Sequence, residues 1–115
     1  MLISEVIKVL DAEILIGDVE LEIDIKGGCG ADLMSDFMAF AKENELLLTG
    51  LVNPQVIRVA EMMDVKVIVF VRGKIPTNEV LELAKEMGMT ILATREPMFN
   101  TCGLLYAAGL RGRGA

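Results

Sequence analysis

The sequence contains no histidine, no tryptophan and, among its 115 residues, two cysteines. Without histidine, a Ser-His-Asp or Cys-His catalytic arrangement is impossible and the usual general base is missing. Two thiols are too few for a disulfide framework, and the chain alone does not supply four nitrogen or sulfur ligands for zinc or an iron–sulfur cluster. We therefore expect a protein that binds or senses rather than an enzyme, and we expect no cofactor.

Long hydrophobic runs are also lacking. Glu5, Lys8 and Asp11 interrupt the first apolar stretch, which excludes a membrane span and a signal peptide at that position. The two cysteines, Cys29 and Cys102, fit a reducing compartment. The sequence therefore predicts a cytoplasmic protein without a membrane partner.

Basic residues are scarce at the start of the chain. The net charge is −6, and residues 1–24 hold seven acids and one base, so the remainder, with ten of each, is neutral. An acidic protein is a poor partner for nucleic acid, because Lys and Arg contacts to phosphate supply most of that affinity. We expect no nucleic acid partner, although the neutral part leaves room for a local basic site.

Apolar residues are abundant, at 53% against 24% charged, which is enough for one packed core. We expect residues 1–110 to form a single α/β domain and residues 111–115 to form a flexible tail. A helical pattern follows Ser4, and residues 13–16 resemble a short strand. Residues 19–26 alternate strictly between apolar and charged side chains, which predicts a strand with one solvated face.

From residue 27 onward the chain repeats a unit of strand, loop and helix. Apolar strands are predicted near residues 46–50, 67–71 and 90–94. Helices are predicted to begin after Asp32 as N-cap, at Asn53-Pro54 and near Thr77, and the last helix reaches Ala108. Continuous apolar strands separated by helices predict a three-layer α/β fold, with a mostly parallel sheet between helices on both faces. The last four strands should point the same way.

Ligands of such sheets bind beyond the carboxyl ends of the strands. The loops expected there are residues 27–32, 49–53, 72–77 and 94–97. They carry Arg72, Lys74 and Arg95 and lead into helix N-termini, a combination that suits an anion. The predicted ligand-binding residues are Gly28, Cys29, Asp32, Thr49, Gly50, Asn53, Arg72, Lys74, Thr94 and Arg95.

Each of these features also has a structural interpretation. The three cations are also interpreted as ordinary solvated loop charges, and the Gly27-Gly28-Cys29-Gly30 run as a tight turn, since it matches no phosphate-loop motif. Asp32 and Asp36 stand four apart, which suits a cation or merely the start of a helix. The cysteines are interpreted as buried, inert thiols, with a redox or shared-metal role as the alternative.

Several segments together resemble a stand-alone DRTGG domain: residues 28–36, 47–58, 70–74 and 98–103. The resemblance implies the fold of the N-terminal, non-catalytic domain of HPr kinase/phosphorylase. It also implies a regulatory, dimer-forming module that works with CBS domains or a partner enzyme. The literal Asp-Arg-Thr-Gly-Gly signature is missing, and Arg72-Gly73-Lys74 stands where many relatives carry Thr-Gly-Gly.

Three functions follow from the sequence. The first is a homodimeric regulatory module that binds a small anionic ligand, a nucleotide or a phosphorylated metabolite, at the strand-end loops. The second is a docking or dimerisation module without a small ligand, which the Met-rich helices favour. The third is a redox or shared-metal sensor based on Cys29.

Overall fold

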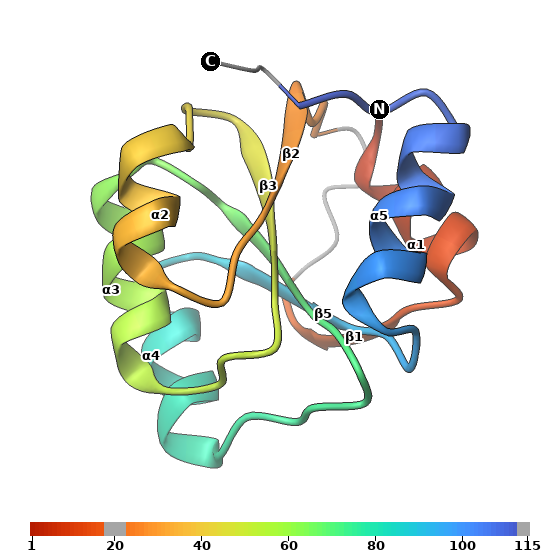
Figure 1. Ribbon diagram of the computed structural model, residues 1–115. Helices are drawn as coiled ribbons and strands as arrows, with labels where there is room; N and C mark the ends of the chain where they lie inside the picture. The colour runs from red at the N-terminus through yellow and green to blue at the C-terminus, as the bar shows by residue number, and fades with distance from the viewer. Residues whose placement is uncertain (18–22, 113–115) are drawn as a thin grey trace.

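The computed structural model describes residues 1–17 and 23–112, and within these ranges five strands form one sheet (Figure 1). The strands lie in the order β1-β5-β4-β3-β2. Strands β3, β4 and β5 are parallel, as predicted; β2, which was not predicted as a strand, is parallel to them, and β1 pairs antiparallel with β5 at one edge. Their bounds are β1 Glu13–Ile16, β2 Gly27–Gly30, β3 Glu45–Thr49, β4 Val67–Phe70 and β5 Thr90–Ala93.

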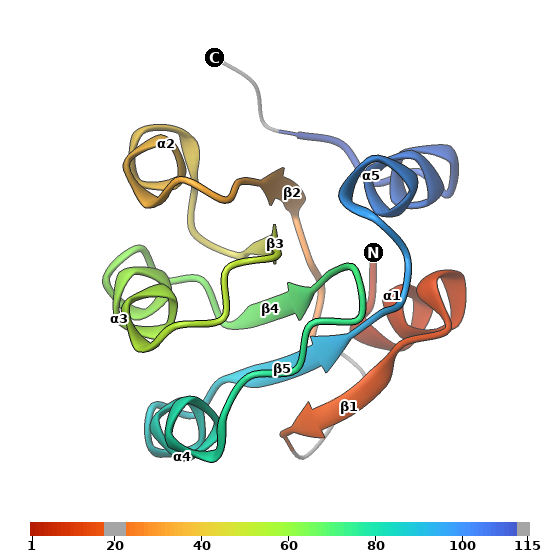
Figure 2. The ribbon, with the colours of Figure 1, turned by 60° about the horizontal axis from the view of Figure 1, so that its bottom comes forward.

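The helices cover both faces of this sheet, which confirms the three-layer α/β architecture. Helices α2, α3 and α4 lie on one face, and α1 and α5 lie on the other (Figure 2). Their bounds are α1 Ile3–Leu10, α2 Met34–Phe40, α3 Pro54–Met62, α4 Asn78–Glu86 and α5 Met98–Ala107.

Strand β4 shows why the central strands are apolar throughout. Ile68 and Phe70 join the core under α2 to α4, whereas Val67 and Val69 join the core under α1 and α5. Because successive side chains of a strand point to opposite faces, a strand covered on both sides buries every residue. The uninterrupted hydrophobic run of β4 therefore correctly predicted a strand covered by helices on both faces of the sheet.

Helix starts were predicted with mixed success. Asn53 caps α3 as expected: its Oδ1 accepts a hydrogen bond from the Val56 N–H at 3.3 Å, and Pro54 occupies the first helical position. Asp32 as the N-cap of α2 was wrong. The helix begins at Met34 after Leu33, with no side-chain cap, because the Asp32 carboxylate bonds to a neighbouring loop.

The glycine run predicted as a loop is strand β2, paired with β3. The reason is close packing. A Cβ on Gly28 would lie 3.2 Å from the Leu110 side chain, and one on Gly30 would lie 3.2 Å from the Met98 sulfur. Glycine at positions 28 and 30 makes room for α5 and the segment after it, and a strand with Cys29 as its one side chain gives no periodic signal.

The strand predicted over residues 19–26 falls mostly on residues 18–22, which lie outside the described ranges. In the part that is described, Asp24 forms an isolated antiparallel bridge with Leu2. The Ile25 N–H donates to the Met1 carbonyl at 2.7 Å, and the Ile25 side chain is buried. Residues 23–26 therefore lie along the start of the chain and form no strand of the main sheet.

Asp24 provides a pH-dependent contact at this point. Lys26 Nζ and the terminal amine each donate to its carboxylate at 2.8 Å, and these bonds lower the pKa of Asp24 from 3.8 to about 2. Because the pKa is lowered in the folded protein, the contact contributes its full stability above about pH 4. That contribution is lost as the pH falls through 2.

We expect a carboxyl NMR titration of Asp24 to show a midpoint near 2. Lys26→Gln should raise the midpoint toward 3.8, because it removes the largest cause of the shift. Lys66→Gln is the matched control, since Lys66 pairs with Asp64 instead. A midpoint near 4 in the unaltered protein would contradict the arrangement.

Candidate ligand-binding site

The topology opens a crevice at the carboxyl ends of β4 and β5. The helix after β4, α4, lies on one face of the sheet, and the helix after β5, α5, lies on the other (Figure 2). The two connecting loops therefore leave adjacent parallel strands in opposite directions. In open α/β sheets, ligands bind at this kind of switch point.

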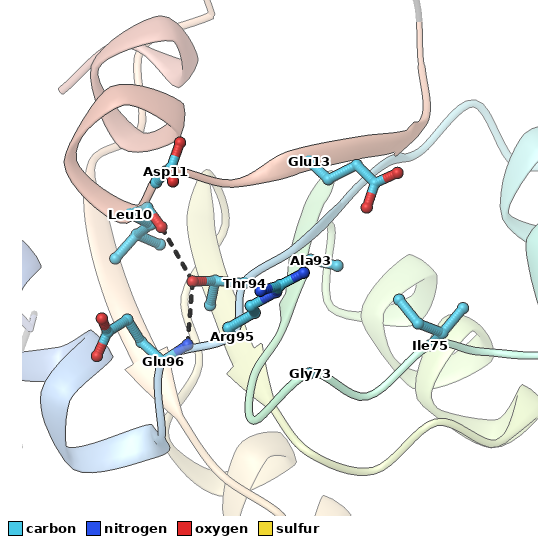
Figure 3. Close-up of a pocket in the computed structure, with 9 residues that line it drawn as sticks. All are labelled: Leu10, Asp11, Glu13, Gly73, Ile75, Ala93, Thr94, Arg95 and Glu96. Atoms are coloured by element: carbon cyan, nitrogen blue, oxygen red, sulfur yellow. Dashed lines mark hydrogen bonds between the residues drawn. The ribbon is translucent and has the colours of Figure 1, made fainter.

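A pocket of about 720 Å³ lies at this switch point (Figure 3). Its size falls within the range of roughly 300–1,000 Å³ typical of small-molecule sites. Its walls come from the turn between α1 and β1, the β4–α4 loop and the β5–α5 loop. The lining residues are Leu10, Asp11, Glu13, Gly73, Ile75, Ala93, Thr94, Arg95 and Glu96.

Thr94 joins two walls of this pocket. Its side chain is 4% exposed, and its hydroxyl donates to the Leu10 carbonyl at 3.0 Å at the end of α1 (Figure 3). The same oxygen accepts from the Glu96 N–H at 3.3 Å. Thr94 was predicted as a ligand-binding residue, and its hydroxyl is fully engaged in holding the pocket together.

The β4–α4 loop is fastened to the same wall through its backbone. The Arg72 N–H donates to the Glu96 carbonyl at 2.8 Å, and the Gly73 N–H donates to the Thr94 carbonyl at 2.9 Å. Arg72 and Gly73 have φ angles of 61° and 68°, in the left-handed region. This conformation costs free energy at Arg72, a residue with a Cβ, and the two hydrogen bonds hold it in place.

The pocket brings one cation together with three carboxylates. Arg95 lies among Asp11, Glu13 and Glu96, and Figure 3 shows its side chain within the group that lines the opening. Within residues 1–17 and 23–112, Arg95 forms no ion pair. Its guanidinium is therefore available to an anionic group, and the carboxylates suit hydroxyl or amino donors on the same ligand.

A second cluster joins the loops that follow β2, β3 and β4, the last of which also lines the pocket. Asp32 Oδ1 accepts from the Gly50 N–H at 2.7 Å and from the Thr49 hydroxyl at 3.2 Å, and Oδ2 lies 3.6 Å from Arg72 Nη2. A Cβ on Gly50 would clash with the Arg72 guanidinium. Glycine therefore lets Arg72 lie across this loop, where it faces Asp32 and not the pocket.

The remaining predicted residues lie apart from the pocket. Asn53 caps α3, and Lys74 is exposed between two pocket-lining residues, Gly73 and Ile75. Gly28 faces the Leu110 side chain at the edge of the sheet. Of the ten predicted residues, Thr94 and Arg95 line the pocket.

The two cysteines lie on opposite faces of β2. Cys29 packs against the core under α2, whereas Cys102 Sγ lies 3.3 Å from where Gly30 would carry a Cβ, on the α5 side. Cys29 is half-buried and Cys102 is exposed, so the interpretation of both as buried thiols was wrong for Cys102. Partial burial raises the pKa of Cys29, assisted by Glu45 and Cys102, and partial desolvation of the thiol also raises the pKa of Cys102. Raised pKa values leave less thiolate, which argues against a reactive Cys29.

Sequence reasoning missed most of the pocket. Gly73 and Glu96 lie in two of the predicted strand-end loops, next to the predicted residues Arg72 and Arg95. Their position in the sequence could therefore have identified them. No local sequence signal pointed to Asp11 and Glu13, because only the pairing of β1 with β5 brings them to the pocket. In the part of the chain that the structure describes, no group of three or more Cys, Asp or Glu side chains is placed to hold a metal ion.

The comparisons with known proteins agree with this fold. The family model described as the DRTGG domain matches residues 5–108. No curated protein matches the chain. No helix in the described ranges is both long and apolar enough to cross a lipid bilayer.

A solved structure is also similar: the CBS and DRTGG domains of the regulatory region of Clostridium perfringens pyrophosphatase, complexed with the activator diadenosine tetraphosphate. The TM-score is 0.74 at 20% sequence identity, over 89% of this chain and 44% of that one. This chain therefore spans less than half the length of that regulatory region.

Proposed function

Because this chain belongs to the DRTGG domain family, we propose that it is a non-catalytic regulatory module that senses a small anionic ligand in the pocket between β4 and β5. The observation that carries the proposal is the position of Arg95. Its guanidinium is in no ion pair among the described residues and lines a pocket at the switch point of the sheet. The protein would act in the cytoplasm as a homodimer, alone or with a partner enzyme.

The chemistry of the pocket favours a nucleotide or a phosphorylated metabolite. A phosphate would pair with Arg95, and sugar hydroxyls or a base amino group would donate to Asp11, Glu13 or Glu96. A bare inorganic anion fits less well, because three carboxylates surround the single arginine. The activator bound by the pyrophosphatase regulatory region has both phosphates and sugars, which supports this ligand class as a proposal for this chain.

Thermal shift and calorimetry with a ligand panel test the proposal. The panel contains AMP, ATP, diadenosine tetraphosphate, glucose 6-phosphate, inorganic phosphate and, as an uncharged control, adenosine. A ligand at a hundredfold excess over its dissociation constant should stabilise the fold by about 2.7 kcal/mol. If no member of the panel shifts the melting curve or releases heat, the proposal fails.

Variants then locate the site. Arg95→Ala should weaken the best ligand by about 10- to 100-fold, the range for losing a charge-assisted hydrogen bond of roughly 1.5–3 kcal/mol. Arg58→Ala, an exposed arginine on α3, should leave affinity unchanged. The double variant Arg72→Ala, Lys74→Ala tests the neighbouring loop. If it weakens binding while Arg95→Ala does not, the pocket is not the site.

A further inference from the structure

Helix α5 presents an uncharged surface on an acidic protein. None of its ten residues, Met98–Ala107, carries a charge, whereas the chain as a whole has a net charge of −6. Thr101 and Leu105 point into the protein and are buried. On the outer side, Phe99 is 86% exposed, and Tyr106 and Leu104 are also exposed. Exposed aromatic side chains of this size are typical of protein interfaces.

The exposed face of α5 has a glycine, Gly103, at its middle, so no side chain projects there. Phe99, Gly103 and Tyr106 follow the i, i+4, i+7 spacing of one helix face. A Cβ on Gly103 would have nothing within 4 Å, so no packing among the described residues requires glycine there. Glycine inside a helix costs about 1 kcal/mol relative to alanine. Close packing of another molecule against α5 at this position would explain the glycine.

We propose that this surface of α5 binds the same surface of a second copy, with the two helices antiparallel and crossing at Gly103. The inference rests on the proposed homodimer and does not require a bound ligand, although Glu96 belongs both to this surface and to the pocket wall. A two-fold axis at Gly103 sets Phe99 of one copy against Ala107 of the other, so that a large side chain meets a small one. An uncharged helix also lets two acidic chains approach without facing carboxylates.

The charges at the two ends of α5 are complementary in this arrangement. Glu96 precedes the helix and Arg111 follows it, about 15 Å of helix apart. Antiparallel pairing brings Glu96 of each copy beside Arg111 of the other. Arg111 is already positioned at this end: its Nη1 donates to the Tyr106 carbonyl at 2.7 Å and its guanidinium stacks 3.8 Å from the Tyr106 ring centre.

The interface is small. The exposed parts of Phe99, Leu104 and Tyr106 in two copies amount to roughly 700–800 Å² in total, which is below the range of stable specific complexes. We therefore expect a reversible dimer with a dissociation constant on the order of micromolar.

Sedimentation velocity of the ligand-free protein, from about 1 to 500 µM, tests the proposal. The unaltered chain should dimerise within this range, and Phe99→Glu should weaken the dimer at least tenfold. The matched control is Met62→Glu, another exposed apolar position (64%), on α3 at the opposite face of the sheet, which should leave the dimer intact. Circular dichroism confirms that both variants remain folded.

A charge exchange tests the antiparallel direction. Arg111→Glu should weaken the dimer, and adding Glu96→Arg should restore it. A chain that stays monomeric at every concentration overturns the proposal, as does a dimer that Met62→Glu dissociates and Phe99→Glu does not. Loss of dimer without rescue by the charge exchange rejects the antiparallel arrangement. Because no ligand is present, these outcomes report on the dimer alone, and the ligand panel, carried out on chains with Glu96 unchanged, tests the pocket separately.

Discussion

Phe37→Ala should lower the free energy of unfolding by about 3–5 kcal/mol, the range for deleting a buried aromatic ring. Phe37 lies on α2, is 0% exposed and belongs to the core between the sheet and helices α2 to α4. The ring is among the largest fully buried side chains of the protein. Its removal loses transfer free energy and leaves a cavity, because the surrounding strands relax only in part.

The matched control lies three residues later on the same helix. Phe40 is 59% exposed, so Phe40→Ala should change the free energy of unfolding by less than about 1 kcal/mol. Urea denaturation of the two variants measures the difference directly. Equal losses would mean that α2 packs with another face toward the sheet.

Thr94→Val should cost about 1–3 kcal/mol although it preserves the size of the side chain. The substitution deprives the Leu10 carbonyl of its donor and the Glu96 N–H of its acceptor, in a region where Thr94 itself is buried. Leaving buried polar groups without partners is costly because water does not replace the lost hydrogen bonds. Two walls of the pocket would then be joined less tightly.

Thr90→Val is the control for this prediction. Thr90 lies on the same strand and is also buried, and its hydroxyl forms no hydrogen bond with the residues that the structure describes. We therefore expect a change within about 0.5 kcal/mol. If Thr94→Val is as mild as Thr90→Val in urea denaturation, the Thr94 hydroxyl does not hold α1 to the β5–α5 turn.

The parts of the fold that were predictable are those with a local signal. Strands β3, β4 and β5 are buried on both faces, so their apolar runs stand out in the sequence. Asn53-Pro54 gave the start of α3 because both residue types have a specific role at a helix N-terminus. Gly88, with a φ of 68°, likewise ends α4.

The parts that were not predictable depend on distant contacts. Strand β2 is glycine because α5 and Leu110 occupy the space that its side chains would need, and no local pattern announces that requirement. Asp32 has the chemistry of an N-cap, but a competing N–H, that of Gly50, lies within reach once β2 and β3 pair. In both cases, tertiary packing overrides the local preference.

The candidate site follows the same division. Sequence reasoning selected the strand-end loops and included Arg95 and Thr94. It placed Arg72 among the anion-binding residues, whereas the structure pairs that guanidinium with Asp32. The direction of a charged loop side chain, and whether its charge is already paired, depend on the side chains opposite it, which the sequence of one loop does not reveal.

The antiparallel pairing of β1 with β5 also bears on the order of folding. Glu13 lies opposite Ala93, so this contact joins segments near the two ends of the chain and carries a large loop-closure entropy. The parallel strands β3, β4 and β5 are each separated by a single helix and close shorter loops, so we expect them to associate first. The pocket acquires Asp11 and Glu13 only when β1 arrives. Its occupant would therefore favour completion of the last step of folding, and its departure would first loosen the N-terminal segment.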